Sequence, residues 1–256
     1  MRVHVFASGS SGNCLLVEED ETRVLIDAGI SRRRLAAALN SLGCAMEQIG
    51  GVLITHEHSD HISGLEGLVK GRKLPVFAPH TVAARLEGAL TSLSEQLRVI
   101  PTGEPFSLGS LRITAFHTSH DTDESVGYRI EGRGVYGHAT DTGCVTEEMR
   151  RFLRGADTVL LESNHDEDML RYGPYPFYLK KRILSTRGHL SNTDCAVFAR
   201  ELAESGTRKI ILAHLSRENN TPQKALDEAE RALAGLPTAL FCAPVLGCLT
   251  VEITSS

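Results

Sequence analysis

The amino-acid sequence predicts an α/β fold in which two β-rich halves, each covered by helices on one face, form a four-layer sandwich. Each half opens with short strand patterns and closes with helical patterns, and no Pro/Gly/Ser-rich linker or internal repeat interrupts the chain. With 256 residues, 41% of them apolar, the chain can bury a sizeable core. We therefore expect a single domain over residues 1–256.

Strand patterns begin the first half. Residues 2–6 and 14–19 are strand-like and joined by a turn of small residues, and residues 22–29 follow as a third strand, so the chain opens as a β-meander. A helix is expected over 31–43, where a serine precedes a helical apolar pattern that ends at a glycine. The apolar run at 50–55 is typical of a buried strand.

The remaining elements alternate in the same way. Further strand patterns lie at 74–79, 97–101, 111–119, 125–132, 134–140 and 208–213. Helical patterns lie at 80–90, 146–154, 177–185, 193–205 and 222–234. Helices thus close both halves, as the four-layer arrangement requires.

Composition narrows the functional classes. A net charge of −5 provides no global basic field, so any nucleic-acid binding must use a local patch. The six cysteines are scattered without a Cys-x-x-Cys pair, which argues against a disulfide framework or a thiolate zinc site. The sequence shows neither a signal-peptide pattern nor an apolar run of the ~18 residues that a membrane span needs. We expect a soluble cytoplasmic protein with reduced thiols and no membrane partner.

Four potential metal ligands, His56, His58, Asp60 and His61, directly follow the predicted buried strand. Imidazoles two positions apart on a loop can converge on one cation, while the carboxylate and the next imidazole face a second cation. The alternative is a polar loop in which Asp60 caps a helix and the histidines are solvated. The complete His-x-His-x-Asp-His pattern favours metal binding.

This stretch resembles the signature of the metallo-β-lactamase superfamily, whose αββα sandwich agrees with the predicted element order. The resemblance implies three further ligands at strand ends: a histidine, a bridging aspartate and a last histidine. Asp141 and His214 fill the last two positions, since each follows or ends a predicted strand. For the first of the three further ligands, two histidines are candidates. His117 lies within the strand pattern whereas His120 lies where the strand should end, and we favour His120.

The resemblance implies two divalent metal ions. It assigns His56, His58 and His120 to one ion and Asp60, His61 and His214 to the other, with Asp141 bridging. These ligands suit Zn²⁺ and Mn²⁺ about equally. Such a centre would lower the pKa of a bridging water, and Asp60 would orient that water or accept its proton. We expect His138, close to Asp141, to be a strand residue or an outer partner.

The tripeptide His-Leu-Ser occurs twice, at His189 and at His214. His189 precedes a helix start, where it could contact an anionic group or donate a proton to a leaving oxygen. The alternative is a capping-loop residue without a chemical role. The C-terminal half resembles that of ribonuclease Z, the transfer-RNA-processing branch of the superfamily. This resemblance implies that His189 is a phosphate contact or general acid and that Glu162 orients it, although Glu162 is equally a strand-end residue without a role.

Blocks spread over nearly the whole chain resemble the YycJ/WalJ group of bacterial metallo-hydrolases. They are residues 7–18, 53–65, 119–128, 139–143, 160–170, 173–192 and 212–223. The resemblance implies a 5′-type exonuclease that hydrolyses DNA. The residues by themselves indicate only a two-metal hydrolase. The alternatives are a cyclic phosphodiesterase, lactonase or thioesterase with the same metals, and a metal-stabilised binding protein without turnover.

Residues 171–187 interleave aromatic and basic side chains in an otherwise acidic chain. Aromatic faces that stack on bases, beside cations that hold phosphates, suit nucleic-acid binding. The alternative is a helix with its aromatics packed inward and a solvated basic face. Asp141 and His214 lie too close in sequence for an inserted domain of ~100 residues between them. We therefore expect the substrate to be bound by this segment, by loops or by a homodimer partner. The candidate contacts are Tyr172, Tyr175, Lys180, Lys181, Arg182 and Arg187.

Overall fold

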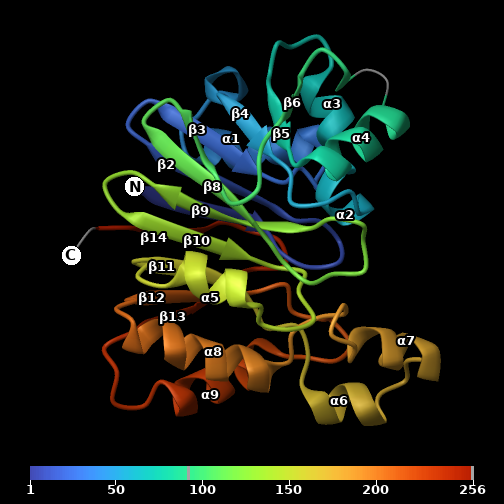
Figure 1. The fold of residues 1–256 in the computed structure, drawn as a ribbon, viewed down its shortest axis with the longest axis vertical. Helices are drawn as coiled ribbons and strands as arrows, with labels where there is room; N and C mark the ends of the chain where they lie inside the picture. Colours follow the sequence, from blue (N-terminus) through green and yellow to red (C-terminus); the bar gives the residue numbers. More distant parts are fainter. Residues whose placement is uncertain (91–92, 255–256) are drawn as a thin grey trace.

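Two β-sheets pack face to face and are covered by helices on both outer faces in the computed structural model, which describes residues 1–90 and 93–254 (Figure 1). The first sheet contains, in spatial order, β14 (Leu249–Glu252), β1 (Arg2–Ala7), β2 (Cys14–Glu19), β3 (Thr22–Ile26), β4 (Gly51–Leu53), β5 (Val76–Ala78) and β6 (Leu97–Val99). The second contains β13 (Ala239–Cys242), β12 (Lys209–Ala213), β11 (Thr158–Glu162), β10 (Val135–Ala139), β9 (Val126–Glu131), β8 (Leu111–His117) and β7 (Pro105–Leu108).

The helices form the two outer layers (Figure 1). The first sheet is covered by α1 (Arg32–Ser41), α3 (Leu65–Val69) and α4 (His80–Ala89), and the second by α5 (Glu147–Leu153), α8 (Asn192–Glu204) and α9 (Pro222–Ala232). Three short helices, α2 (Ser59–Ile62), α6 (Glu167–Tyr172) and α7 (Phe177–Ile183), lie at one end of the sandwich, and the 3₁₀ turn η1 (Met46–Gln48) precedes β4. The predicted αββα sandwich is confirmed.

Strand direction determines where the loops meet. The strands β3 to β6 run parallel in the first sheet, and β10 to β13 run parallel in the second. β8 and β10 each pair antiparallel with β9, so they point the same way. Loops that follow such strands gather at one edge of a sheet, which is where open α/β sheets place their sites.

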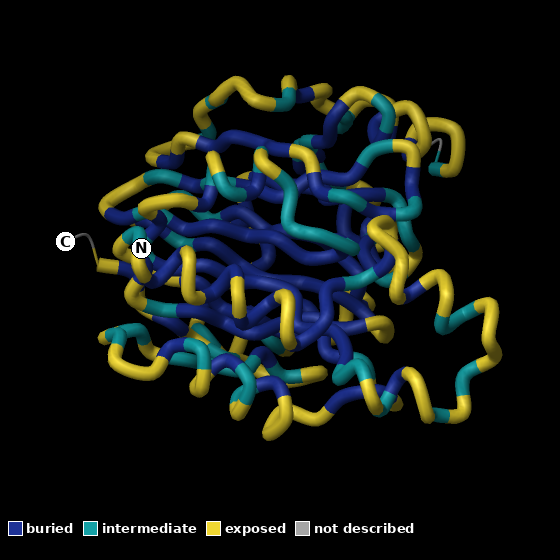
Figure 2. Tube along the Cα trace, turned by 60° about the horizontal axis from the view of Figure 1, so that its bottom comes forward, coloured by how far each residue is buried: buried dark blue, intermediate teal, exposed yellow. Residues whose placement is uncertain are grey.

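The central strands are buried on both faces. Within the segment that contains β4, Leu53 packs in the cluster between the sheets, whereas Ile54 packs in the cluster beneath the first helical layer. Full burial of such a side chain stabilises the fold by roughly 1.5–3 kcal/mol, which explains why this run is apolar without alternation. Figure 2 shows the strands as a buried layer, with exposed residues concentrated in outer helices and loops.

Side-chain caps start several helices where the sequence predicts them. Ser31, Ser191 and Thr221 each accept a hydrogen bond from a backbone N–H three residues later, which satisfies one of the unpaired donors of the first turn. The opening β-meander is also confirmed. The predicted third strand is shorter than expected, because Asp27 adopts a left-handed backbone conformation with φ of 60° and ends it.

Sequence patterns missed some elements. These are the strands β7, β11, β13 and β14 and the short helices α2, α3 and α6. The strands β7, β13 and β14 are only four residues long, which leaves little room for a periodic pattern. All six cysteines are free thiols. Over the described residues, the longest apolar helical stretch falls short of what would be needed to cross a membrane.

Candidate metal centre

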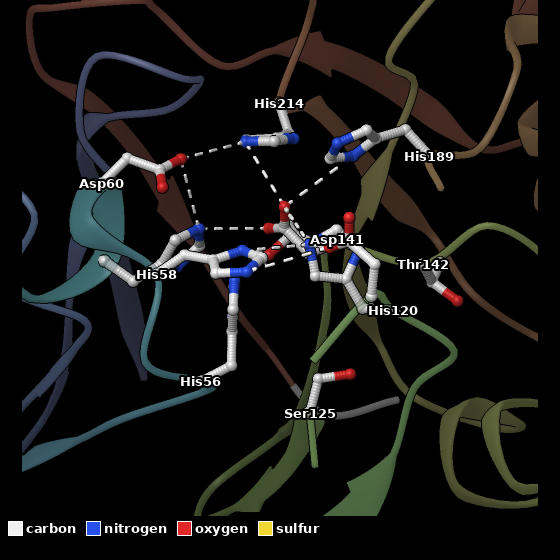
Figure 3. Close-up of polar contacts among 12 residues, drawn as sticks. His56, His58, Asp60, His120, Ser125, Asp141, Thr142, His189 and His214 are labelled. Atoms are coloured by element: carbon white, nitrogen blue, oxygen red, sulfur yellow. Dashed lines mark hydrogen bonds and ion pairs between the residues drawn. The ribbon is translucent and has the colours of Figure 1, made fainter. Parts of the chain in front are cut away.

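The candidate ligands lie on loops that follow β4, β8, β10 and β12, so they gather at a single edge of the sandwich. The loop after β4 carries His56 and His58 and leads into α2, which contains Asp60 and His61. His120, Asp141 and His214 come directly or shortly after the other three strands. Residues far apart in the sequence therefore meet in one cluster (Figure 3).

Backbone strain is concentrated at this edge. Asp27, Asp141 and His214 have φ values of 60°, 54° and 55°, in the left-handed region that non-glycine residues rarely occupy. This backbone conformation costs roughly 1–3 kcal/mol per residue, and it persists only where surrounding contacts hold the residue in place. For His214 the surroundings are visible, since its N–H donates to Ser8 Oγ at 2.8 Å and its carbonyl accepts from Asn164 Nδ2 at 2.8 Å.

One half of the cluster is made of imidazoles. His56, His58 and His120 each place a ring nitrogen within 4.8 Å of the others. His120 Nδ1 lies 3.1 Å from the carbonyl of Gly188, and because a carbonyl only accepts, Nδ1 carries the proton and Nε2 keeps a free lone pair. That Nε2 lies 3.3 Å from His58 Nδ1. Burial holds the pKa of His56 well below its ordinary value, which keeps its ring neutral and able to bind a cation.

The other half combines imidazoles with a carboxylate. Asp60, His61 and His214 place one potential ligand atom each within 4.8 Å of the others. His61 Nδ1 donates to Asp27 at 2.7 Å, and the opposite nitrogen, Nε2, lies 3.6 Å from Asp60 Oδ2. His214 Nε2 lies 3.8 Å from the same Asp60 oxygen. Burial alone lowers the pKa of His61, but Asp27 and Asp141 outweigh it and raise this pKa to about 10.

Asp141 lies between the two halves (Figure 3). Its Oδ2 is 3.2 Å from His61 Nε2, while its Oδ1 is 3.7 Å from His120 Nε2 and 3.6 Å from His214 Nε2. Burial raises the pKa of this carboxyl, but His214 and His61 together hold it well below its usual range. A carboxylate whose oxygens face imidazoles of both groups has the geometry of a bridging ligand.

The orphaned polar atoms test whether these residues fit a metal ion. His56 Nε2, His214 Nε2 and Asp141 Oδ2 are buried without a hydrogen-bond partner among the described residues. Such an atom costs roughly 1–3 kcal/mol when nothing satisfies it. All three belong to the groups with metal-binding geometry, and imidazole nitrogen with carboxylate oxygen is a donor set for divalent cations. The residues therefore fit divalent metal.

Several candidate ligands have a second residue that fixes the outer ring nitrogen, as metal-binding histidines usually do. Thr55 Oγ1 lies 3.0 Å from His56 Nδ1, and Asp27 holds His61. Asn13 Nδ2 lies 3.3 Å from Asp60 Oδ2. Sequence reasoning missed these three residues. An aspartate at a strand end, followed by Ala28 and Gly29, was the available signal for Asp27, whereas Thr55 and Asn13 lacked any.

Glu162 holds both His-Leu-Ser histidines. Its Oε1 accepts from His189 Nδ1 and from His214 Nδ1, each at 2.8 Å. Its Oε2 accepts from the backbone N–H of Thr142 at 2.8 Å and of Leu190 at 3.3 Å. Burial raises the pKa of Glu162, but His189 and His214 outweigh it and lower the pKa to about 2. Glu162 is therefore both a strand-end residue and a shared partner of two histidines.

His189 is outside the two groups described above, but together with Asp141, Glu162 and His214 it forms a further group whose potential ligand atoms lie within 4.8 Å of one another. Its Nδ1 is 3.7 Å from Asp141 Oδ1, and its ring centroid is 5.1 Å from that of His120 and 5.2 Å from that of His214. Its side chain is 21% exposed, against 2% for His214. Nδ1 donates to Glu162, and the hydrogen bonds and ion pairs of His189 with the described residues do not involve its Nε2.

The two remaining histidines considered from the sequence lie outside the cluster. His117 ends β8 with a 47% exposed side chain, and its ring contacts Glu148 at 3.2 Å and Glu124 at 3.5 Å. His120, the favoured alternative, is in the cluster. His138 is a buried residue of β10 whose Nδ1 lies 3.2 Å from Tyr136 Oη, and burial lowers its pKa to about 4.

The aromatic residues of the 171–187 segment are not packed inward. Tyr172, Phe177 and Tyr178 are 78%, 82% and 74% exposed, while Tyr175 is half-buried. The alternative of inward-packed aromatics is therefore wrong for these three. The helices that carry them, α6 and α7, project from the same end of the sandwich as α2 (Figure 1).

Most basic side chains of this segment already have partners within the protein. Lys180 Nζ donates to the carbonyls of Arg171 at 2.9 Å and Gly173 at 2.7 Å, where α6 ends. Arg182 pairs with Asp121, and Arg187 donates to backbone carbonyls of the loop that carries His120. Among the described residues Lys181 makes no such contact and is exposed.

Comparisons with known proteins agree with this fold. Residues 22–215 match the model of the β-lactamase superfamily domain. The chain is 37% identical over 223 residues to exodeoxyribonuclease YycJ of Bacillus anthracis and 36% identical over 225 residues to exodeoxyribonuclease WalJ of Streptococcus pneumoniae, covering 86% of this chain and 84% of each relative. The crystal structure of YhfI from Bacillus subtilis, described as a metallo-β-lactamase fold protein, superposes with a TM-score of 0.74 at 19% identity, covering 98% of this chain and 99% of YhfI.

The αββα sandwich and its edge cluster of histidines and aspartates define a class, the metal-dependent hydrolases of the metallo-β-lactamase fold. The chain belongs to the β-lactamase superfamily. Within it, the identity over most of its length joins the chain to the group of YycJ and WalJ.

Proposed function

We propose that this protein is a two-metal phosphodiesterase that removes nucleotides from DNA as a 5′-type exonuclease. Two relatives that match 86% of the chain are named exodeoxyribonucleases, which supports the substrate class. The two imidazole groups on either side of Asp141 support two divalent ions, Zn²⁺ or Mn²⁺, rather than one. We further propose that residues 1–256 act as one catalytic domain without an inserted cap.

His189 is the observation that carries this proposal. A carbonyl-cleaving hydrolase of this fold needs only its metal cluster, whereas a phosphodiesterase gains from an extra donor at the phosphate and at the leaving oxygen. His189 is such an extra donor, because it lies beside Asp141 but keeps a nitrogen free of the cluster. Burial lowers the pKa of His189, but Glu162 outweighs it and raises this pKa, which favours a ring that donates to a phosphate or to a leaving oxygen.

Residues of the chain divide the remaining work. Bound divalent ions would supply Lewis-acid stabilisation and an activated water. Asp60, whose side chain is 22% exposed, would orient such a water and accept its proton. Its carboxylate is anchored by Asn13 Nδ2 at 3.3 Å, which limits its motion between the two imidazoles that it faces. Glu162 fixes the ring plane of His189.

The α6–α7 region offers a surface for the nucleic acid. The exposed rings of Tyr172, Phe177 and Tyr178 provide faces on which bases stack, an interaction worth about 1–3 kcal/mol per base. Lys181 is the cation of this region that is available to a phosphate. Because the chain as a whole is acidic, DNA binding needs a local surface, and we propose that the α6–α7 region provides it.

The proposal is tested with protein reconstituted in turn with Zn²⁺ and Mn²⁺. Duplex and single-stranded DNA and RNA carry a label at the 5′ or the 3′ end, and products are separated by length. A 5′ exonuclease releases labelled mononucleotide at once from 5′-labelled DNA and yields a ladder of shortening 3′-labelled strands. His117→Ala is the matched control, since this histidine lies outside the cluster. Intact nucleic acid, together with turnover of a cyclic phosphodiester, a lactone or a thioester, would overturn the nuclease assignment and leave the hydrolase.

A further inference from the structure

The outer ring nitrogens of the candidate ligands suggest a role for Asp121, a residue to which nothing above assigns a function. Four of the five imidazoles have their outer nitrogen held at 3.1 Å or less. The partners are Thr55 for His56, Asp27 for His61, the Gly188 carbonyl for His120 and Glu162 for His214. His58 is the fifth, and it turns Nδ1 toward His120 and Nε2 away from it.

Asp121 faces this remaining nitrogen. Its Oδ1 is 3.8 Å from His58 Nε2, an ion-pair distance, and 3.3 Å from His120 Nε2. This Oδ1 is buried and has no hydrogen-bond partner among the described residues, so it keeps its full capacity to accept a proton from His58. Asp121 is absent from the His56–His58–His120 group, although its Oδ1 lies close to two of these ligands.

The other oxygen of Asp121 connects to the α6–α7 region. Arg182, in α7, pairs with Oδ2 and thereby fixes the carboxylate in its orientation. Arg187 strengthens the same connection, since its Nε donates to the His120 carbonyl at 2.8 Å and its guanidinium also donates to the Thr122 carbonyl. The segment that follows α7 is therefore bound to the loop of His120 through both side chains and backbone.

We propose that Asp121 is a positioning residue for His58, and that the Arg182–Asp121 pair connects the His56–His58–His120 half of the metal centre to the α6–α7 surface. The sequence suggests Arg182 and Arg187 as phosphate contacts, but in this proposal they bind other residues of the protein instead. Only the link to a DNA-binding surface rests on the proposed function. The effect on the metal centre stands without it.

The chain contains a matched control two residues further on. Asp123 pairs with Arg85 of α4, and both side chains are more than half exposed. This pair has the same chemistry and lies on the same loop, but the described contacts of Asp123 include none of the candidate ligands. Removal of Asp123 therefore reports the cost of losing an Arg–Asp pair from this loop without affecting His58.

The experiment titrates metal-free protein with Co²⁺ and follows the visible d–d absorption, with calorimetry to count binding events. Asp121→Asn should weaken one of two events about 10- to 100-fold and change its absorption band, the usual cost of losing an outer carboxylate. Asp123→Asn should bind as the wild type does. Arg182→Ala should weaken the same binding event to a smaller extent. Arg182→Lys should partly restore the affinity, because lysine returns the positive charge but not the planar guanidinium that pairs with a carboxylate through two N–H groups. Circular dichroism and thermal melting establish that each variant is folded.

Two results would overturn the inference. Identical cobalt spectra and isotherms for wild type, Asp121→Asn and Arg182→Ala would show that the pair does not reach the metal centre. A rise in KM for DNA in Arg182→Ala, with unchanged cobalt binding, would return Arg182 to the role of a phosphate contact. Because the cobalt titration uses no substrate, it gives its answer even if the protein fails to cut DNA.

Discussion

The two His-Leu-Ser tripeptides make the same local contacts in two different surroundings. In each copy the histidine Nδ1 donates to Glu162 Oε1 at 2.8 Å. The leucines, Leu190 and Leu215, are buried in the same apolar cluster beneath the second helical layer. The serines each accept a backbone N–H from three residues on, in Ser191 at 3.0 Å and in Ser216 at 3.2 Å.

What differs is the chain before each copy. His214 ends the buried strand β12 in a left-handed conformation, so its Nε2 turns into the cluster toward Asp60 and Asp141. His189 follows a glycine at the end of the loop from α7, and its side chain remains about a fifth exposed. A single carboxylate thus orients one imidazole into the cluster, and we propose that it orients the other toward the substrate. The comparison teaches that position, not the tripeptide, decides the role.

The largest expected effect comes from removing the buried copy. His214→Ala should lower metal affinity by more than the ~100-fold that the loss of an outer partner costs, and activity should fall with it. Elemental analysis after dialysis measures the metal, and the rise of the melting temperature on adding Zn²⁺ should shrink, since binding to the folded state stabilises it. Unchanged metal content in this variant would remove the distinction between the two copies.

Removing the exposed copy should separate catalysis from metal binding. His189→Ala should lose about 10²- to 10⁴-fold in kcat, the usual contribution of a positioned acid or base. Its metal content and its melting temperature with Zn²⁺ should match those of the wild type. A wild-type rate would reduce His189 to a loop residue, and a loss of metal would make it a ligand.

The shared carboxylate should couple the two copies. Glu162→Gln keeps the shape of the side chain but removes its charge, so we expect a loss of about 10- to 100-fold in metal affinity together with a lower kcat. Measurement of both quantities in the His189→Ala/Glu162→Gln double variant sharpens the point. The metal defect should persist in it, whereas the kcat defects should not add, because both changes disable one imidazole. Additive kcat losses would mean that Glu162 acts elsewhere.

The smallest effect should come from the surface that surrounds the exposed copy. Lys181→Ala should weaken DNA binding severalfold and reduce the slope of log K against log salt by about one. Lys73→Ala is the control, because this exposed lysine precedes β5 and so lies at the opposite edge of the first sheet. Equal salt slopes for the two variants would reject Lys181 as a phosphate contact.

Local patterns predicted the layers and four of the ligand candidates because both depend on short-range order, whereas His120, Asp141 and His214 were implied by the resemblance to the superfamily. Periodicity marks strands and helices, and four candidates lie within the single stretch from His56 to His61. Partners that lie far apart in sequence left no such pattern. Asp27 is 34 residues from His61, and Arg187 is 67 residues from His120, whose carbonyl it binds. The sequence therefore suggested Arg182 and Arg187 as free cations, although the fold gives both of them internal partners.

The pairing of β1 with β14 has a consequence for synthesis on the ribosome. Arg2 lies opposite Glu252 in the first sheet. One edge of β1 therefore stays unpaired until β14, one of the last strands to be synthesised, is available. An open strand edge is a template for unwanted pairing, and contacts of such long range slow folding. The nascent chain should thus depend on holding chaperones until β14 emerges, and truncation before residue 249 should yield aggregates although every residue of the metal cluster is present.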